Sequence, residues 1–250
     1  MEIETIHFAS GATSKVVRVS RGANPAEIIA NLGISRPRAT VCLNGGTANL
    51  ERELSSRLES LLADGLARVA AEESLTVITG ATDAGIFSLL GRGVERWGLN
   101  APLIGVAPEK LVAWPGREVG DTPLEPHHTH FVLVEGEEWG DETATMYALA
   151  AELSRNCPSL AVYAGGGMVA GNEMQANVKQ DRQMILIGGS GRKTDDVLAA
   201  RRGVPVEDEA VPRIAAEGRI VPFDIHAGAQ ALAGLIRNLL VIAPELSGKK

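Results

Sequence analysis

Short, uninterrupted apolar runs alternate with amphipathic segments along most of this chain, and several of these runs end in glycine-rich loops. Residues 39–43 stop at Asn44-Gly45-Gly46-Thr47, and residues 75–78 break at a loop over 79–85. Strands that alternate with helices predict parallel βαβ units, and strands without polar alternation suit a sheet covered on both faces. We therefore predict an α/β fold. It is a single Rossmann-like, doubly wound, mostly parallel sheet with helices on both faces, formed by one domain over residues 1–250.

Hydrophobic periodicity and turn residues divide the rest of the chain in the same way. The predicted strands cover residues 15–20, 39–43, 75–78, 103–106, 130–134, 160–163, 184–187 and 220–223. The predicted helices cover residues 25–33, 50–66, 86–94, 146–153, 195–202 and 227–241, with a short helix within 206–217. The segment 107–126 is rich in Pro and Gly, which predicts an irregular connection.

Four glycine-rich loops follow predicted strands, at residues 44–47, 79–85, 164–167 and 188–192. Ligands of open parallel sheets bind at the carboxyl edge of the strands, where glycine lets backbone amides approach an anion and helix N-termini add positive charge. One such loop is common in any α/β protein, but four on adjacent strands favour a phosphate-binding edge. None of the loops gives G-x-G-x-x-G or a P-loop, so an ordinary Rossmann dehydrogenase and a P-loop NTPase are both unsupported.

The loop over residues 188–194, Gly-Gly-Ser-Gly-Arg-Lys-Thr, carries the most chemistry. Its amides are suited to an anion-binding concavity, Ser190 and Thr194 offer hydroxyls, and Arg192 offers a fork that matches phosphate. The alternative for Arg192 is a surface or salt-bridge role. Asp195 would repel an anion, and we expect it to cap the following helix.

Charge and composition exclude several classes of function. A net charge of -7 and a pI of about 5.3 argue against a long nucleic-acid groove, although they allow a mononucleotide. The chain has no apolar run of about 18 residues and no N-terminal secretory pattern, so we predict no membrane span and a cytoplasmic location. Cys42 and Cys157 match no metal or redox spacing.

Three histidines, His127, His128 and His130, lie close together and suggest a metal site. In an extended segment His127 and His128 would point to opposite faces, and no carboxylate or cysteine partner is evident. We therefore predict no metal and a structural or pocket-wall role for these side chains. The acidic run over residues 135–142 is expected to be a solvated loop, in which Trp139 is a candidate lid residue.

Several stretches resemble the cytosolic N-terminal region of TRPM-type ion channels. They are residues 44–97, 102–112, 124–136 and 186–199, in the same order along the chain. That region belongs to the SLOG superfamily, which also includes the LOG phosphoribohydrolases, and prokaryotes carry free-standing versions called LSDAT or TRPM-SLOG domains. The resemblance runs from about residue 40 to residue 200. The channel pore has no counterpart here, so channel activity is not carried over.

The resemblance implies a pocket for a nucleotide-derived ligand such as ADP-ribose, NAD or a cyclic relative; no other cofactor is implied with certainty. By motif, the ligand contacts would fall on Gly45, Gly46, Thr47, Thr79, Gly80, Thr82, Gly85, Gly166, Gly167, Gly189, Ser190, Gly191 and Arg192. We therefore expect binding or sensing of a small nucleotide derivative. Related folds often self-associate, which leaves homo-oligomerisation open.

Two alternative functions follow from the same residues. Enzymatic relatives use a P-G-G-x-G-T-x-x-E loop, and residues 165–173 keep two of its glycines and place Glu173 in register with its glutamate, without the Pro, the third Gly and the Thr. The first alternative is therefore cleavage of a nucleotide N-glycosidic bond with Glu173 as the catalytic residue. The second is an assembly domain with a vestigial pocket.

Overall fold

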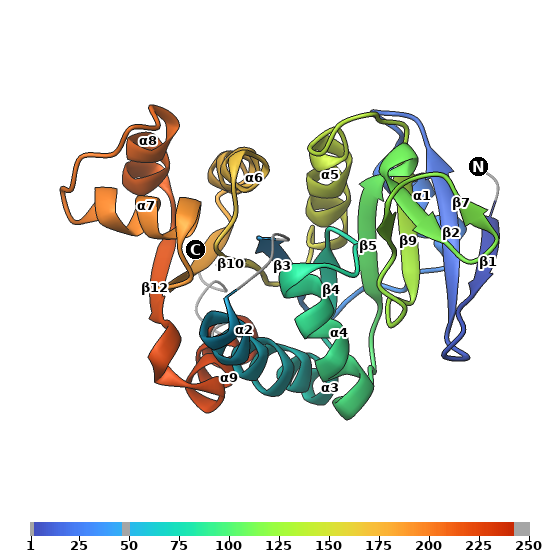
Figure 1. Cartoon of the computed structure of the whole chain (residues 1–250), viewed down its shortest axis with the longest axis horizontal. Coiled ribbons are helices and arrows are strands. Elements are labelled where there is room, and N and C mark those ends of the chain that lie inside the picture. Colours follow the sequence, from blue (N-terminus) through green and yellow to red (C-terminus); the bar gives the residue numbers. More distant parts are fainter. Residues whose placement is uncertain (1–2, 47–50, 243–250) are drawn as a thin grey trace.

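The computed structural model describes residues 3–46 and 51–242, and its centre is a nine-stranded sheet (Figure 1). The strands run in the order β1-β2-β9-β5-β4-β3-β10-β11-β12. Their bounds in that order are Ile3–His7, Thr13–Val19, His130–Val134, Leu103–Pro108, Thr76–Thr79, Thr40–Gly45, Ser159–Ala164, Gln183–Gly188 and Ile220–Asp224. Every neighbouring pair is parallel except β1 and β2. The predicted doubly wound, mostly parallel sheet is confirmed.

Helices cover both faces of the sheet. In Figure 1, α2, α3, α4 and α9 lie below it and α5, α6, α7 and α8 above it. The lower helices are α2 (Arg52–Glu59), α3 (Arg68–Glu73), α4 (Gly85–Trp97) and α9 (Ala229–Arg237). The others are α1 (Pro25–Leu32), α5 (Thr143–Leu153), α6 (Met168–Lys179), α7 (Arg192–Arg201) and α8 (Ala210–Glu217). The helix predicted over 50–66 extends further, to Glu73, because a π-helical segment, Ser60–Ala67, joins α2 directly to α3.

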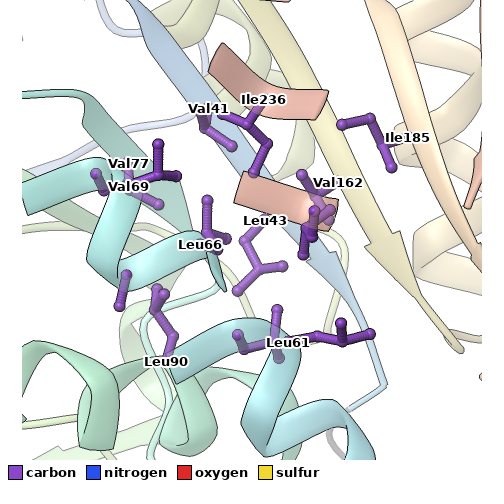
Figure 2. Packing of buried hydrophobic residues seen from close by; sticks show 14 of the residues in the cluster. Val41, Leu43, Leu61, Leu66, Val69, Val77, Leu90, Val162, Ile185 and Ile236 are labelled. Carbon is purple, nitrogen blue, oxygen red and sulfur yellow. The ribbon is translucent and has the colours of Figure 1, made fainter. Parts of the chain in front are cut away.

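The central strands contribute side chains to two hydrophobic cores, one on each face of the sheet. On β3, Val41 and Leu43 pack into the lower core with α2, α4 and α9, whereas Cys42 packs into the upper core with α1, α5 and α6. Figure 2 shows the lower core, in which Leu61 and Leu66 of the π-helical segment meet β3 and β10. Burial on both faces explains why these strands have no polar alternation in the sequence.

The segment predicted to be irregular contains a second, smaller sheet. After a short 3-10 turn, η2 (Glu109–Leu111), β6 (Val112–Trp114) pairs with β7 (Arg117–Glu118) and β8 (Thr122–Pro123). Val112, Trp114 and Leu124 pack with Phe131 in a third apolar cluster. Within residues 3–46 and 51–242, no helix is long and apolar enough to cross a bilayer.

Close helix packing predicts opposite effects of alanine at two helical glycines. A Cβ on Gly93 of α4 would lie 2.5 Å from the Cα of Ala63, whereas one on Gly234 of α9 would meet nothing within 4 Å. We expect Gly93→Ala to lower the free energy of unfolding by about 1–3 kcal/mol, because the two helices must separate. Gly234→Ala should raise it by about 0.5–1 kcal/mol through helix propensity. Urea unfolding of both variants measures this difference, and equal shifts would contradict the packing.

Candidate functional site

The sheet changes winding direction between β3 and β10, and a cavity of about 420 Å³ opens at the carboxyl ends of the strands there. From β3 the chain continues to β4 and β5 on one side, and β10 to β12 follow on the other. Such a topological switch point is where open α/β sheets bind ligands. All four glycine-rich loops contribute to the wall, which comprises Gly45, Gly46, Gly80, Thr82, Ala84, Phe87, Thr122, Trp139, Glu142, Gly167, Met168, Val169, Ala170, Glu173 and Arg192.

Two helices begin at this cavity without side-chain caps, and in α4 the Ile86 amide donates a 3.2 Å hydrogen bond to the carbonyl of Gly46. Helix α4 begins after Ala84 and helix α6 after Gly167, and neither residue supplies a capping side chain. Ala84 and Gly167 both line the cavity, as does the first turn of α6, residues 168–170. The first amides of a helix have no intrahelical partner and carry the positive end of its dipole. The cavity therefore has an electropositive side suited to an anion.

The loops after β3 and β10 approach each other closely at the same place. The Gly46 amide donates a 3.0 Å hydrogen bond to the carbonyl oxygen of Ala164. A Cβ on Gly45, whose φ is +147°, would lie 2.0 Å from that oxygen. Glycine is required at position 45 by both backbone conformation and space.

Arg192 is exposed and lines the cavity, beside Gly167. It forms no ion pair and no side-chain hydrogen bond with any residue in the described part of the chain. The guanidinium is therefore available to an anion at the N-terminus of α6, which supports the predicted phosphate contact rather than a salt-bridge role.

The amides of the loop before Arg192 do not form an open anion site. Gly189 and Gly191 donate 2.8 Å hydrogen bonds to Oδ1 and Oδ2 of Asp195, respectively, so a carboxylate of the chain already occupies that concavity. Neither glycine lines the central cavity. We revise the predicted ligand contacts of Gly189 and Gly191 for this reason. Asp195 lies within the first turn of α7 and not at its N-cap, which is Gly191, so it fixes the preceding loop in place of the expected cap.

Two predicted hydroxyls instead connect neighbouring loops. Ser190 accepts a 2.8 Å hydrogen bond from the Gly165 amide and donates to the carbonyl of Ile187. Thr194 donates a 2.7 Å bond to the carbonyl of Gly165. Ser190, Gly85 and Gly166 lie outside the cavity wall, and both glycines have positive φ in their turns. The motif residues thus include loop-shaping positions as well as wall positions. Thr47 lies outside the described residues.

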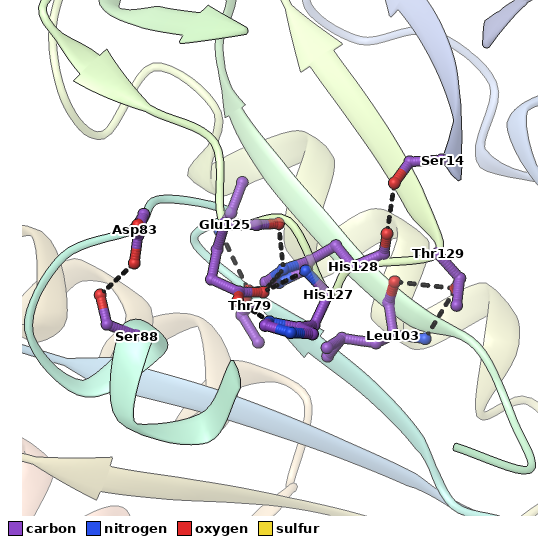
Figure 3. Close-up of polar contacts among 10 residues, drawn as sticks. Ser14, Thr79, Asp83, Ser88, Leu103, Glu125, His127, His128 and Thr129 are labelled. Carbon is purple, nitrogen blue, oxygen red and sulfur yellow. Dashed lines mark hydrogen bonds and ion pairs between the residues drawn. The ribbon is translucent and has the colours of Figure 1, made fainter. Parts of the chain in front are cut away.

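Thr79 belongs to a buried network that shapes the second loop (Figure 3). Its hydroxyl donates to Nε2 of His128 over 2.6 Å and accepts the Ala81 amide over 3.0 Å. Nδ1 of His128 donates to Glu125 over 2.8 Å, and Nδ1 of His127 contacts the same carboxylate over 2.6 Å. Thr79 is fully buried, so we revise its predicted ligand contact to support of Gly80 and Thr82.

The same network corrects the expectation for the histidines. Residues 125–129 form a turn rather than an extended segment, so His127 and His128 both reach Glu125, a partner that the sequence pattern did not reveal. Burial raises the pKa of the Glu125 carboxyl, but the hydrogen bonds from His128 and His127 outweigh it and hold the pKa below its usual value. The ionised carboxylate thus fixes both rings.

Two carboxyl groups, those of Glu142 and Glu173, line the same cavity as Arg192. Glu173, on the second turn of α6, is 8% exposed and Glu142, before α5, is 6% exposed. Burial, with the Glu142 charge nearby, raises the pKa of Glu173 to about 8, so it is mainly protonated at pH 7. Burial also raises the pKa of Glu142, while hydrogen bonds from backbone amides, including that of Gly140 at 2.8 Å, favour its ionised form.

A polar network behind Glu173 fixes helix α6 to the sheet. The Asn177 amide group donates to the hydroxyls of Tyr147 and Tyr163, over 3.0 Å and 2.6 Å, and to the carbonyl of Glu173 over 3.2 Å. Arg182 donates a 3.0 Å bond to Asn177. These hydrogen bonds fix the backbone of α6 at Glu173, whose side chain lines the cavity.

Residues 38–233 match the family described as "SLOG in TRPM, prokaryote". The chain belongs to this family. Among curated proteins, this SLOG chain is similar to the transient receptor potential cation channel subfamily M member 2 of Mus musculus, at 25% identity over 248 aligned positions. The same channel of Rattus norvegicus is 24% identical over 220 positions. These alignments cover 82% and 73% of the SLOG chain but only 16% and 14% of the channels.

The SLOG resemblance and the geometry agree on seven of the fifteen wall residues. Of the residues assigned by motif, Gly45, Gly46, Gly80, Thr82, Gly167, Arg192 and Glu173 line the cavity. The motif did not include Phe87, Met168 and Glu142, and Trp139 was singled out only as a lid candidate. Glu142 also corrects the expectation of a solvated acidic run, since its carboxyl is buried at the cavity.

Proposed function

We propose that the cavity binds a phosphate-bearing nucleotide derivative, with a phosphate at the N-terminus of α6 beside Arg192. One observation carries this proposal: an uncapped helix terminus and an unpaired guanidinium, within the described residues, face the same cavity. A volume of about 420 Å³ lies in the range of small-molecule sites. ADP-ribose, NAD and cyclic relatives are the candidate ligands. A cytoplasmic location is part of the proposal, supported by the two free cysteines.

Calorimetry against ADP-ribose, NAD, cyclic ADP-ribose and AMP tests the proposal. We expect at least one of these ligands to bind with a Kd below about 1 mM, the range that a few charge-assisted contacts supply. Failure of the whole panel to bind at millimolar concentration would exclude a nucleotide-binding role.

The Arg192→Ala variant should bind the tightest ligand of the panel with a Kd about tenfold to hundredfold higher than wild type, because one charge-assisted hydrogen-bonding group is lost. Arg202→Ala is the matched control, since Arg202 lies on the surface after α7, outside the cavity wall. It removes the same charge and should leave the Kd nearly unchanged. Equal losses in Arg192→Ala and Arg202→Ala would show that only net charge matters.

Glu173 favours a second candidate, cleavage of an N-glycosidic bond in a nucleotide. Its side chain lines the cavity and its pKa of about 8 makes it a proton donor at neutral pH, suited to protonating a leaving base. Incubation with NAD and nucleoside monophosphates, followed by measurement of released base, separates an enzyme from a sensor. Undiminished release by Glu173→Gln would exclude this role. A pocket filled by side chains would favour the vestigial-pocket alternative, and a cavity of about 420 Å³ gives it no such support.

A further inference from the structure

The carboxyl groups of Glu142 and Glu173 are not used by phosphate binding, although both face the same cavity. They come from different elements: Glu142 precedes α5, and Glu173 lies within α6. Carboxyl oxygens carry negative charge when ionised and give a phosphate no added attraction. Their burial beside a phosphate site therefore favours a second part of the ligand that gains from carboxyl groups.

Glu142 is held in place by the chain. Its Oε2 accepts the amide of Gly140 over 2.8 Å, which orients the carboxyl group and offsets part of the effect of burial, which raises its pKa. Glu173 is different, because its carboxyl has no hydrogen bond to the described residues although the side chain is only 8% exposed. The hydroxyl of Thr82, on the wall of the same cavity, is also buried without a partner there. These unpaired groups point to polar atoms supplied by a ligand.

The spacing along α6 connects the two parts of the site. Glu173 is three residues beyond Ala170 at the helix N-terminus, which corresponds to roughly 4.5 Å along the helix axis. That is the scale of one sugar ring. A phosphate at the first turn would therefore bring an attached pentose beside the carboxyl groups.

We propose that Glu142 and Glu173 together recognise the vicinal hydroxyls of a ribosyl group attached to the phosphate. The Glu142 carboxyl accepts from the hydroxyls, as acidic residues do for ribose in other nucleotide-binding sheets, while the protonated Glu173 carboxyl donates. This inference rests on the proposed nucleotide site. It makes the pair a specificity determinant that favours ribonucleotides over deoxyribonucleotides.

Among the titratable groups around Glu173, Glu142 is the one whose charge raises the pKa of Glu173. Tyr163 of β10 and Tyr147 of α5 have pKa values raised well above their usual range by burial, and burial raises the pKa of Cys42 on β3 to about 11. These three groups stay neutral near pH 8. The Arg182 guanidinium lies over the Tyr147 ring, 5.8 Å from its centroid, and Arg192 lies beside Gly167 at the α6 terminus. Ionisation of Glu173 would place a negative charge beside the Glu142 carboxyl and remove the proton that Glu173 donates to the ribose.

Calorimetry with AMP, 2′-deoxy-AMP and 2′,3′-dideoxy-AMP at pH 7 in EDTA tests the inference, with Glu142→Gln compared with Glu138→Gln. Glu138 is exposed in the same loop, outside the cavity wall. We expect wild type and Glu138→Gln to lose about tenfold or more in affinity on hydroxyl removal. Glu142→Gln should discriminate by less than about twofold, and its melting curve establishes that it is folded.

Three outcomes are decisive. Equal affinities of wild type for AMP and 2′-deoxy-AMP would overturn ribosyl recognition while leaving phosphate binding intact. AMP binding that EDTA abolishes would replace the proposal with a cation bridging phosphate and carboxylates. Absence of binding by any nucleotide, ADP-ribose included, would instead remove the proposed function itself. As support, AMP affinity should fall above about pH 8 in wild type and remain level in Glu173→Gln.

Discussion

Replacement of Gly45 by alanine is expected to lower the free energy of unfolding by about 3 kcal/mol or more. The new Cβ would lie 2.0 Å from the carbonyl oxygen of Ala164 and 3.0 Å from Cδ1 of Ile86, at a φ of +147°. Because β3 and β10 are adjacent at the switch point, relief of this contact requires the two strands to move apart. We expect ligand binding to be lost together with stability.

Gly46→Ala is the matched control for this prediction. Its Cβ would meet the Gly166 nitrogen at 3.4 Å, an ordinary contact. Its stability should therefore stay within about 1 kcal/mol of wild type, as for most tolerated substitutions. Urea unfolding of the two variants makes the comparison, and a Gly45→Ala protein as stable as Gly46→Ala would refute the close approach of the loops.

Replacement of Glu173 by glutamine is expected to stabilise the protein increasingly as pH rises. The carboxyl pKa is 4.5 in the unfolded chain and about 8 in the fold, so only the folded state holds the proton between these values. Wild-type stability from this group is complete below pH 4.5 and falls by about 1.4 kcal/mol per pH unit up to about pH 8, where the loss levels off. Glutamine, which cannot ionise, avoids this loss.

Unfolding free energies of wild type, Glu173→Gln and Glu138→Gln from pH 4 to pH 9 measure the effect. The advantage of Glu173→Gln should be near zero at the acidic end and reach several kcal/mol at pH 8, whereas Glu138→Gln should track wild type. A constant advantage at every pH would mean that packing rather than proton binding separates the variants.

The central strands were predictable because burial on both faces leaves an unbroken apolar run, as in 39–43 and 184–187. Helix α6 was not predicted, since its buried positions include Gly171, Glu173 and Asn177, which give no apolar period. Strand β1 was missed because most of its residues are exposed at an edge of the sheet. Neither element therefore carries the hydrophobic period that identifies a helix or strand in a sequence.

The site was predictable at the glycines of the loops that follow the strands. Gly45, Gly46, Gly80 and Gly167 line the cavity as the loops suggested. The hydrogen-bonding partners of side chains were not predictable: Ser190 and Thr79 bind backbone or histidine atoms of distant segments, which no local pattern encodes. Glu142 was hidden in an acidic run, and its position directly before a helix was the available signal.

A crystal structure of the protein with the tightest ligand of the nucleotide panel tests the central claim most directly. We predict phosphate density at the first turn of α6, within hydrogen-bond distance of the amides of residues 168–170 and of the Arg192 guanidinium. The sugar should lie toward Glu142 and Glu173, and Gly189 and Gly191 should keep their bonds to Asp195. Density for the phosphate elsewhere, or an empty cavity with the ligand bound on another surface, would contradict the account.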